Sequence, residues 1–334
     1  MKKEILLIVQ SPIGIASILQ IYKDKVRSEE ITIICIGTIG LYKYLEGLKL
    51  KCQLYFIKPV AYTDYKIGYL KRLMNQRVLI KKTCNKWKEI YFSSLIQDLY
   101  TITLINECKK DKVNLYKIET GLNSLVNYSA KTSFKHKLVE IFIGILIKIA
   151  TGVTINTIYL SGRYFYSYRN SDQIINIDVK LNPEIYEDYG VNISGDLTYN
   201  ILLMESLGDD SDFYCNYQNQ LLVLVNKLLS NGTVYVKGHP TYGLSKILRD
   251  DKRLKYLDQS IPAAMINLKN FSLIVGIDSA ALKEVRHQNI VSVIDRFEVK
   301  DEAIKQNFKN YLKEGLGNKI KFRSINELNF VSMV

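Results

Sequence analysis

Short apolar runs alternate with longer amphipathic stretches along the first half of the chain. The runs predict strands at Glu4–Val9, Ile31–Ile36, Gln53–Ile57 and 113–118. Apolar residues at helical spacing between them predict helices over 15–24, 41–48 and 91–109. Strands that alternate with helices in this way are typical of a parallel sheet covered by helices.

The second half repeats this pattern. Helical spacing over 218–229 ends at Asn231-Gly232, and further helices are expected over 282–287 and 301–312. Strands are expected at 233–236, 273–277 and 289–294. We therefore predict an α/β protein of two doubly wound, Rossmann-like domains joined near residues 155–190.

The charge is unevenly distributed, and this supports two domains. Residues 1–155 contain 25 Lys and Arg against 12 Asp and Glu, whereas residues 156–334 contain 21 of each. All of the net charge of +13 in this 334-residue chain therefore comes from the first part. We place an N-terminal domain at 1–155 and a C-terminal domain at 156–334.

The basic half indicates an anionic partner. Positive charge is densest over 66–88, and a second basic segment, 131–148, leads into an apolar helix. Such a helix either packs inside the domain or lies on an anionic membrane surface. The sequence contains no zinc-finger spacing and no aromatic RNA-binding strand, so we do not expect nucleic acid as a partner.

Export and membrane-spanning signals are not found in the sequence. The first apolar run is too short for a signal-peptide core, and the longest apolar stretch, 141–147, is too short for a span. Five scattered cysteines without CxxC spacing argue against a zinc site or a disulfide framework. We expect a cytoplasmic protein, with the inner face of the cell membrane as a further possible location.

Ligands of doubly wound folds bind at the carboxyl ends of the strands, so residues that follow strands are informative. Ser11, Pro12 and Gly14 follow the first strand, where a glycine lets a ligand approach backbone N–H groups. Glu119 follows the strand at 113–118. Its carboxylate is either a general base or an ordinary capping or solvated acid.

The strongest local signal is Lys237-Gly238-His239-Pro240, directly after the strand at 233–236. A histidine between glycine and proline can titrate near neutrality and donate a proton to a leaving group. The other two histidines, His136 and His287, lie in charged, helix-like segments and are expected at the surface. After the strand at 273–277, Asp278-Ser279 predicts a helix N-cap at which a phosphate could bind.

Together these motifs resemble the bacterial sialyltransferases of GT-B architecture, the lipooligosaccharide, capsular and polysialic acid group that is glycosyltransferase family 52-like. That group carries an acidic motif before glycine, a Lys-x-His-Pro motif and a later serine-containing or threonine-containing turn. They correspond here to Glu119-Thr120-Gly121, Lys237-Gly238-His239-Pro240 and Asp278-Ser279. The opening Ser11-Pro12-Ile13 is similar to a turn of the lipooligosaccharide branch.

The resemblance implies two Rossmann-like domains with the active site in the cleft between them. It implies an inverting transfer of sialic acid, or a related nonulosonic acid, from a CMP-sugar to a hydroxyl of a capsule, O-antigen or lipooligosaccharide glycan. No metal and no further cofactor would be required. Glu119 would be the base, and His239 would be the acid or cationic partner of the departing phosphate.

The remaining residues implied by the resemblance fall into two groups. Those expected to bind the donor are Lys237, Gly238, Pro240, Pro262, Asp278 and Ser279. Those expected to bind the acceptor are Ser11, Pro12, Gly14, Gly121 and Asn123. A homodimer is left open.

Two positions depart from the family pattern and keep other functions in view. Thr120 replaces an acid, and Ser260-Ile261-Pro262 is followed by Ala263-Ala264-Met265 where related enzymes have a ribose-binding glutamate. A glycerophosphotransferase that uses CDP-glycerol would retain His239 and Ser279 but would need no base at Glu119. A non-catalytic module that binds polyanions or membranes would explain the basic half alone.

Overall fold

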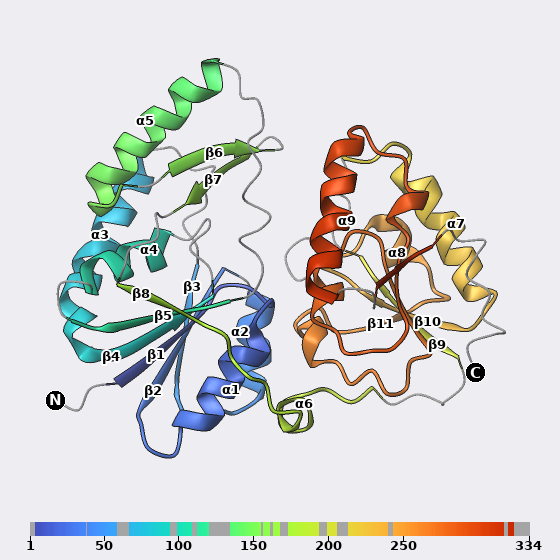
Figure 1. Ribbon diagram of the computed structural model, residues 1–334, viewed down its shortest axis with the longest axis horizontal. Coiled ribbons are helices and arrows are strands. Elements are labelled where there is room, and N and C mark those ends of the chain that lie inside the picture. Colours follow the sequence, from blue (N-terminus) through green and yellow to red (C-terminus); the bar gives the residue numbers. More distant parts are fainter. Residues whose placement is uncertain are drawn as a thin grey trace. The chain divides into compact units, whose positions relative to one another are not determined.

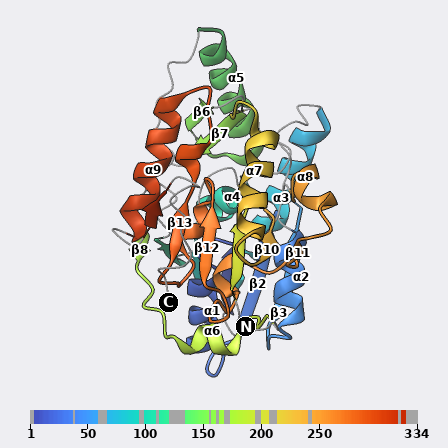
Figure 2. The same cartoon turned by 90° about the vertical axis from the view of Figure 1, so that its right-hand side faces the viewer.

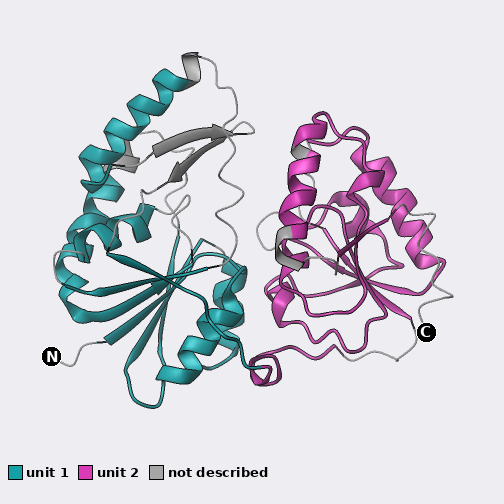
Figure 3. Ribbon diagram, in the orientation of Figure 1, with its two compact units in different colours: residues 1–182 teal, residues 183–334 magenta. Residues whose placement is uncertain are grey.

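The computed structural model describes residues 4–37, 39–58, 67–93, 99–108, 112–119, 134–154, 156–160, 163–167, 173–193, 199–205, 213–239, 243–316 and 320–323. The chain divides into two compact units, residues 1–182 and residues 183–334 (Figure 3). The position 155/156, at which we placed a domain boundary, lies inside the first unit. Each unit is built around its own parallel sheet.

Unit 1 contains six parallel strands among its described residues, in the order β3-β2-β1-β4-β5-β8 (Figure 1). They are β1 (Glu4–Val9), β2 (Ile31–Ile36), β3 (Gln53–Ile57), β4 (Trp87–Phe92), β5 (Asn114–Ile118) and β8 (Ile174–Ile177). When the six strands of this sheet are numbered in chain order, their order across the sheet is 3-2-1-4-5-6, as in the dinucleotide-binding fold.

Helices cover both faces of this sheet because its strands are apolar on both sides. Leu6 and Ile8 pack into a core shared with α3 (Ile67–Thr83), α4 (Leu99–Cys108) and α5 (Phe134–Thr151), while Ile5 and Leu7 point to the opposite face. The other helices of the unit are α1 (Ile15–Lys25) and α2 (Ile39–Gly47). A separate antiparallel pair consists of β6 (Asn156–Leu160) and β7 (Arg163–Ser167).

Unit 2 repeats the same strand order, β11-β10-β9-β12-β13-β14, again with every pair parallel. Its strands are β9 (Asn200–Met204), β10 (Thr233–Lys237), β11 (Lys255–Tyr256), β12 (Leu273–Gly276), β13 (Ile290–Ser292) and β14 (Ile320–Phe322). Its helices are α6 (Glu184–Asp188), α7 (Tyr217–Leu229), α8 (Lys246–Asp250) and α9 (Glu302–Leu316). Figure 2 turns this unit toward the viewer. The predicted fold of two Rossmann-like domains is confirmed.

Two predicted helices differ from the structure: the one over 91–109 is wrong in part, and the one over 282–287 is wrong entirely. Tyr91 and Phe92, the first two residues of the expected helix over 91–109, belong to strand β4, and the described helix in this range is α4. The aromatic and branched side chains of Trp87, Ile90, Tyr91 and Phe92 suit a buried strand, and β4 lies between β1 and β5.

The expected helix over 282–287 is replaced by a single 3-10 turn, η5 (Ala280–Lys283), followed by a loop. His287 is part of that loop and is half-buried. Its Nε2 lies 2.9 Å from the Phe271 carbonyl oxygen, and its Nδ1 lies 3.1 Å from the Asn289 N–H nitrogen. These backbone partners on both sides of the ring fix a turn that helical spacing alone does not reveal.

Candidate functional site

The crossover direction of unit 2 reverses at β9, because β10 lies on one side of β9 and β12 lies on the other. Ligands of such sheets bind beyond the carboxyl ends of the strands at this switch point. Glu205 follows β9, Gly238-His239 follows β10, and Asp278-Ser279 comes shortly after β12. One strand separates β10 from β12, so their ends lie about 10 Å apart. The structure therefore brings two of the three main motifs to one edge of one sheet.

The His239 loop is closed by a pair of backbone hydrogen bonds. His239 N–H donates to the Gly243 carbonyl at 2.9 Å, and Gly243 N–H donates back to the His239 carbonyl at 2.8 Å. A Cβ on Gly238 would lie 2.8 Å from both the Gly243 carbonyl oxygen and Leu244 Cγ, and Gly243 has a φ of +77°. Both glycines are therefore required for this tight loop. Pro240 lies outside the described residues.

Lys237 is buried at the end of β10, and its ammonium group stabilises the loop. Its Nζ donates to the Gly238 carbonyl at 2.9 Å and to the Gln259 carbonyl at 3.2 Å. Burial lowers the pKa of Lys237 to about 8, although Asp258 opposes this shift. The side chain therefore contributes a positive potential to the loop while two of its hydrogen bonds go to backbone carbonyls.

His239 is held in its neutral form at pH 7. Burial lowers the pKa of its imidazole to about 4, and the charge of Lys237 adds to this effect. A neutral imidazole offers one N–H donor and one acceptor nitrogen. An anionic phosphate beside the ring would raise this pKa, because an opposite charge favours the protonated form.

The lowered pKa of His239 predicts a pH-dependent stability. Below pH 6.5 the unfolded chain protonates this histidine, whereas the folded chain does so only near pH 4. The free energy of unfolding should therefore fall between pH 6.5 and pH 4, by at most about 3 kcal/mol from this residue. Urea unfolding of wild type and His239→Asn at several pH values measures it. The difference in the free energy of unfolding between the two proteins should shrink or reverse in sign toward pH 4. A difference that does not change with pH would contradict the lowered pKa of His239.

Glu205 was not predicted from the sequence, and it anchors the His239 loop. The side chain is 2% exposed. Its Oε1 accepts a hydrogen bond from the Tyr217 hydroxyl at 2.9 Å, and its Oε2 accepts one from Ser245 N–H at 2.7 Å. Its own N–H donates to the Lys237 carbonyl at 3.1 Å. Glu205 thus ties β10, α7 and the start of α8 together beneath the loop.

Asp278 and Ser279 lie in the turn that leads from β12 into η5. Ser279 is buried, but its side chain makes no capping hydrogen bond, and η5 has only four residues. The predicted helix N-cap is therefore a short turn without the dipole of a long helix. The Tyr214 hydroxyl lies near Asp278. Burial first and then the charge of Asp278 raise the pKa of Tyr214 well above its usual value.

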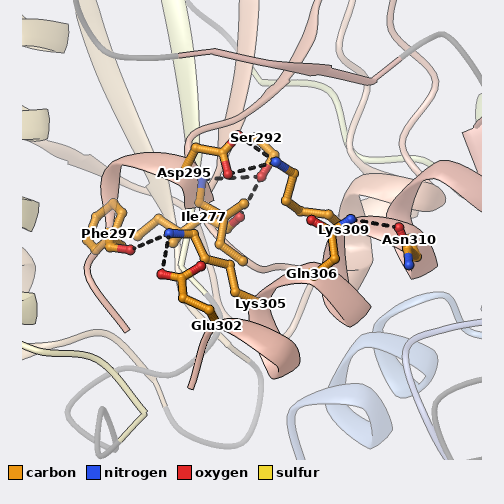
Figure 4. Close-up of polar contacts among 10 residues, drawn as sticks. Ile277, Ser292, Asp295, Phe297, Glu302, Lys305, Gln306, Lys309 and Asn310 are labelled. Atoms are coloured by element: carbon orange, nitrogen blue, oxygen red, sulfur yellow. Dashed lines mark hydrogen bonds and ion pairs between the residues drawn. The ribbon is translucent and has the colours of Figure 1, made fainter. Parts of the chain in front are cut away.

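A polar network supports this turn from the side of β13 and α9 (Figure 4). The Ser292 hydroxyl donates to the Ile277 carbonyl at 2.7 Å and so fixes the residue directly before Asp278. Lys305 Nζ donates to the Phe297 carbonyl at 3.1 Å, and Lys309 forms an ion pair with Asp295 at 2.7 Å. The end of β12 is therefore held by β13, and α9 is attached to the segment that follows β13.

Pro262 begins a buried 3-10 turn, η4 (Ala263–Met265). Its carbonyl accepts a hydrogen bond from Met265 N–H at 2.9 Å. The turn has no carboxylate, so a ribose contact of the kind known from the resembling enzymes does not come from these three residues.

The corresponding edge of unit 1 contains the predicted acceptor turn. Ser11 Oγ accepts a hydrogen bond from Ile13 N–H at 3.2 Å, and Gly14 has a φ of 83° at the start of α1. Gln10 was not predicted from the sequence as a site residue, and it links the ends of β1 and β4 to α4. Its side chain accepts a hydrogen bond from Ser93 N–H at 3.3 Å and donates to Thr101 Oγ1 at 3.2 Å. The Pro12 carbonyl accepts a hydrogen bond from Ile15 N–H at 3.3 Å.

Glu119 follows β5 directly and is exposed. Its N–H donates to the Ile177 carbonyl at 3.0 Å, which extends the β5–β8 pairing and leaves the carboxylate outside the sheet. Thr120, Gly121 and Asn123 lie outside the described residues. Glu119 belongs to unit 1 and His239 to unit 2. In the part of the chain that the structure describes, no group of three or more His, Cys, Asp or Glu side chains could hold a metal ion.

The sequence matches no protein-family model and no curated protein. Solved structures to which the chain is similar include Staphylococcus aureus MnaA with UDP, at 12% identity over 96% of this chain and 89% of that chain, with a TM-score of 0.48. Another is the UDP-GlcNAc 2-epimerase of Methanocaldococcus jannaschii, at 13% identity over 99% and 91%, with a TM-score of 0.48. A third is Acinetobacter baumannii MurG, at 9% identity over 99% and 88%, with a TM-score of 0.40.

Proposed function

We propose that this protein is a glycosyltransferase that binds a nucleotide-activated sugar in unit 2, and that its donor is a CMP-linked sialic acid or related nonulosonic acid. The observation that carries the proposal is the neutral, part-buried imidazole of His239 in a glycine-dependent loop at the carboxyl end of β10. The loop borders the switch point of a Rossmann-like sheet, where nucleotides bind in this class of fold. Its Lys-x-His-Pro sequence supports the choice of donor through its resemblance to the bacterial sialyltransferases.

The chemistry follows from the charge of the leaving group. In the proposed reaction, Glu119 removes the proton of an acceptor hydroxyl, whose oxygen then forms the new bond to the anomeric carbon. The bond from that carbon to the phosphate oxygen breaks, and CMP departs with both electrons. The negative charge of the donor's phosphate raises the pKa of His239, so the imidazole can take up a proton from solvent when the donor binds and donate it to the departing CMP.

The strand-end segments favour a single phosphate over a diphosphate. Neither 237–239 nor 276–279 contains an arginine, and the Lys237 ammonium donates to two backbone carbonyls. The negative charge of a monophosphate leaving group needs fewer positive side chains to neutralise it than the charge on the two phosphates of a UDP-sugar. The buried Ser279 hydroxyl, without a capping hydrogen bond, offers a further donor at the end of β12.

Calorimetry with CMP, CDP, UDP and CDP-glycerol, without added metal, tests this donor choice. CMP should bind most tightly, and His239→Ala, which removes the donor altogether, should weaken CMP binding about 10- to 100-fold, because a hydrogen bond to a charged phosphate is lost. His287→Gln is the matched control in the same unit and should leave CMP affinity unchanged. Tighter binding of UDP would replace the CMP assignment, and no binding of any nucleotide would overturn the glycosyltransferase proposal.

A CDP-glycerol glycerophosphotransferase is the second candidate, favoured by the loss of the neighbouring acid at Thr120. The variant Glu119→Gln separates the two functions. Under the sialyltransferase proposal, removal of the general base should lower transfer from CMP-sialic acid by about 10²- to 10⁴-fold with little change in CMP affinity. An initial-rate assay measures this. Near-normal transfer from CDP-glycerol in Glu119→Gln would establish the second candidate.

A further inference from the structure

Helix α5 exposes a continuous row of large apolar side chains. Each is more than half exposed, and they occupy one face of the helix at intervals of three and four residues: Leu138, Ile141, Phe142, Ile145 and Ile149. The opposite face packs Ile143, Ile147 and Ala150 into the core of unit 1. The helix is therefore held in place by one apolar face and presents a second one to its surroundings, which is the mark of a binding surface.

Helix α3 packs against α5 and extends this surface with positive charge (Figure 1). Met74, Val78 and Leu79 are also more than half exposed. They alternate with basic side chains that are exposed as well: Lys71, Arg72, Lys81 and Lys82. Helix α3 contains no acidic residue. We refer to the exposed residues of α3 and α5 as the basic apolar face.

The charge of the two units indicates what this face binds. Unit 1 contains 28 Lys and Arg against 14 Asp and Glu, whereas unit 2 contains 18 against 19. A second copy of the chain would bring two positive faces together, and like charges oppose such a contact. A nucleic acid would satisfy the charge but would leave the apolar row of α5 without a partner.

We propose that the basic apolar face docks on a lipid bilayer that carries anionic headgroups. Helix α5 would lie in the interface with its apolar row among the acyl chains, while the lysines and arginines of α3 contact phosphate groups. Eighteen residues give α5 a length of about 27 Å, enough for the row to lie along the membrane plane. Among the described residues no helix is long and apolar enough to cross a membrane. The proposal stands on unit 1 alone and is independent of the donor site.

Sedimentation with lipid vesicles tests the proposal on the full chain. The protein should bind vesicles of phosphatidylglycerol and phosphatidylcholine, and should bind pure phosphatidylcholine at least about tenfold more weakly. Ile141→Asp with Phe142→Asp should lower binding to the mixed vesicles about tenfold or more, because two large apolar contacts are replaced by charges that the headgroups repel. Lys81→Glu with Lys82→Glu should also lower it, and added salt should remove much of the remainder.

Matched controls come from unit 2. Leu222 and Val223 are exposed apolar residues on α7, so Leu222→Asp with Val223→Asp should leave vesicle binding unchanged. Lys252→Glu with Lys269→Glu provides the same control for charge, since both lysines are exposed. Circular dichroism and the midpoint of thermal unfolding would verify that each variant remains folded. Equal binding of neutral and anionic vesicles, equal loss in the unit 2 controls, or a dimer that dissociates only in the α5 variant would overturn the proposal.

Discussion

Replacement of His239 by asparagine is expected to lower the rate of sugar transfer by about 10²- to 10⁴-fold, the usual contribution of a positioned acid. The imidazole is neutral before the donor binds, because burial and Lys237 lower its pKa to about 4. The phosphate of the bound donor raises this pKa, so the imidazole can take up a proton from solvent when the donor binds and give it to the departing phosphate. Asparagine retains a donor of similar reach but cannot take up or release a proton, so it removes the titrating function while keeping the loop closed.

Steady-state kinetics with CMP-sialic acid and a galactose-ended acceptor measure this effect. Loss of the acid should appear mainly in kcat, whereas loss of a ground-state contact appears in KM. The profile of kcat/KM against pH should also lose its dependence on a group of lowered pKa in the variant. His287→Gln should retain kcat within about twofold, since the ring of His287 binds the Phe271 carbonyl and the Asn289 N–H. Wild-type turnover in His239→Asn would remove this residue from the reaction.

Much of the fold could be predicted because parallel strands bury both faces and leave uninterrupted apolar runs in the sequence. Glu4–Val9 and Ile31–Ile36 are such runs, and both are strands at the predicted bounds. Strand β9 was not predicted, although Ile201–Met204 is apolar, because a run of four residues is too short to separate from a helix turn or a loop. The expected helix over 91–109 included the last two residues of β4 for a related reason, since the apolar residues of Trp87–Phe92 fit both a buried strand and a helix turn.

The part of the candidate site that could be predicted consists of residues that directly follow strands. A histidine between glycine and proline after an apolar run is visible in the sequence, and the structure places His239 at the carboxyl end of β10. The hydrogen bonds of Glu205 that support the His239 loop could not be predicted from the sequence. Tyr217 and Ser245 are 12 and 40 residues from Glu205, and only the fold brings them to its carboxylate. Burial also changes the chemistry of Lys237 in a way that composition cannot show, because its pKa depends on surroundings supplied by several elements.

Glu205→Ala is expected to destabilise unit 2 by about 2–5 kcal/mol. The substitution leaves the buried Tyr217 hydroxyl and Ser245 N–H without their acceptor, and each unmade hydrogen bond of this kind costs about 1–3 kcal/mol. It also frees the start of α8 from β9, so the loop that ends at Gly243 loses its anchor. We therefore expect CMP affinity to fall as well, because the His239 loop loses this support.

Urea unfolding of Glu205→Ala, Tyr217→Phe and the double variant measures the coupling. Tyr217→Phe should cost about 1–2 kcal/mol, and the double variant should cost less than the sum, because the two residues share one hydrogen bond. Glu298→Ala removes an exposed acid from the same unit and should stay within about 0.5 kcal/mol of wild type. Additive losses, or a Glu205→Ala protein as stable as wild type, would contradict this anchoring role. Weakened CMP binding in Glu205→Ala at a temperature where the protein remains folded would show that the hydrogen bonds of this carboxylate set the geometry of the His239 loop.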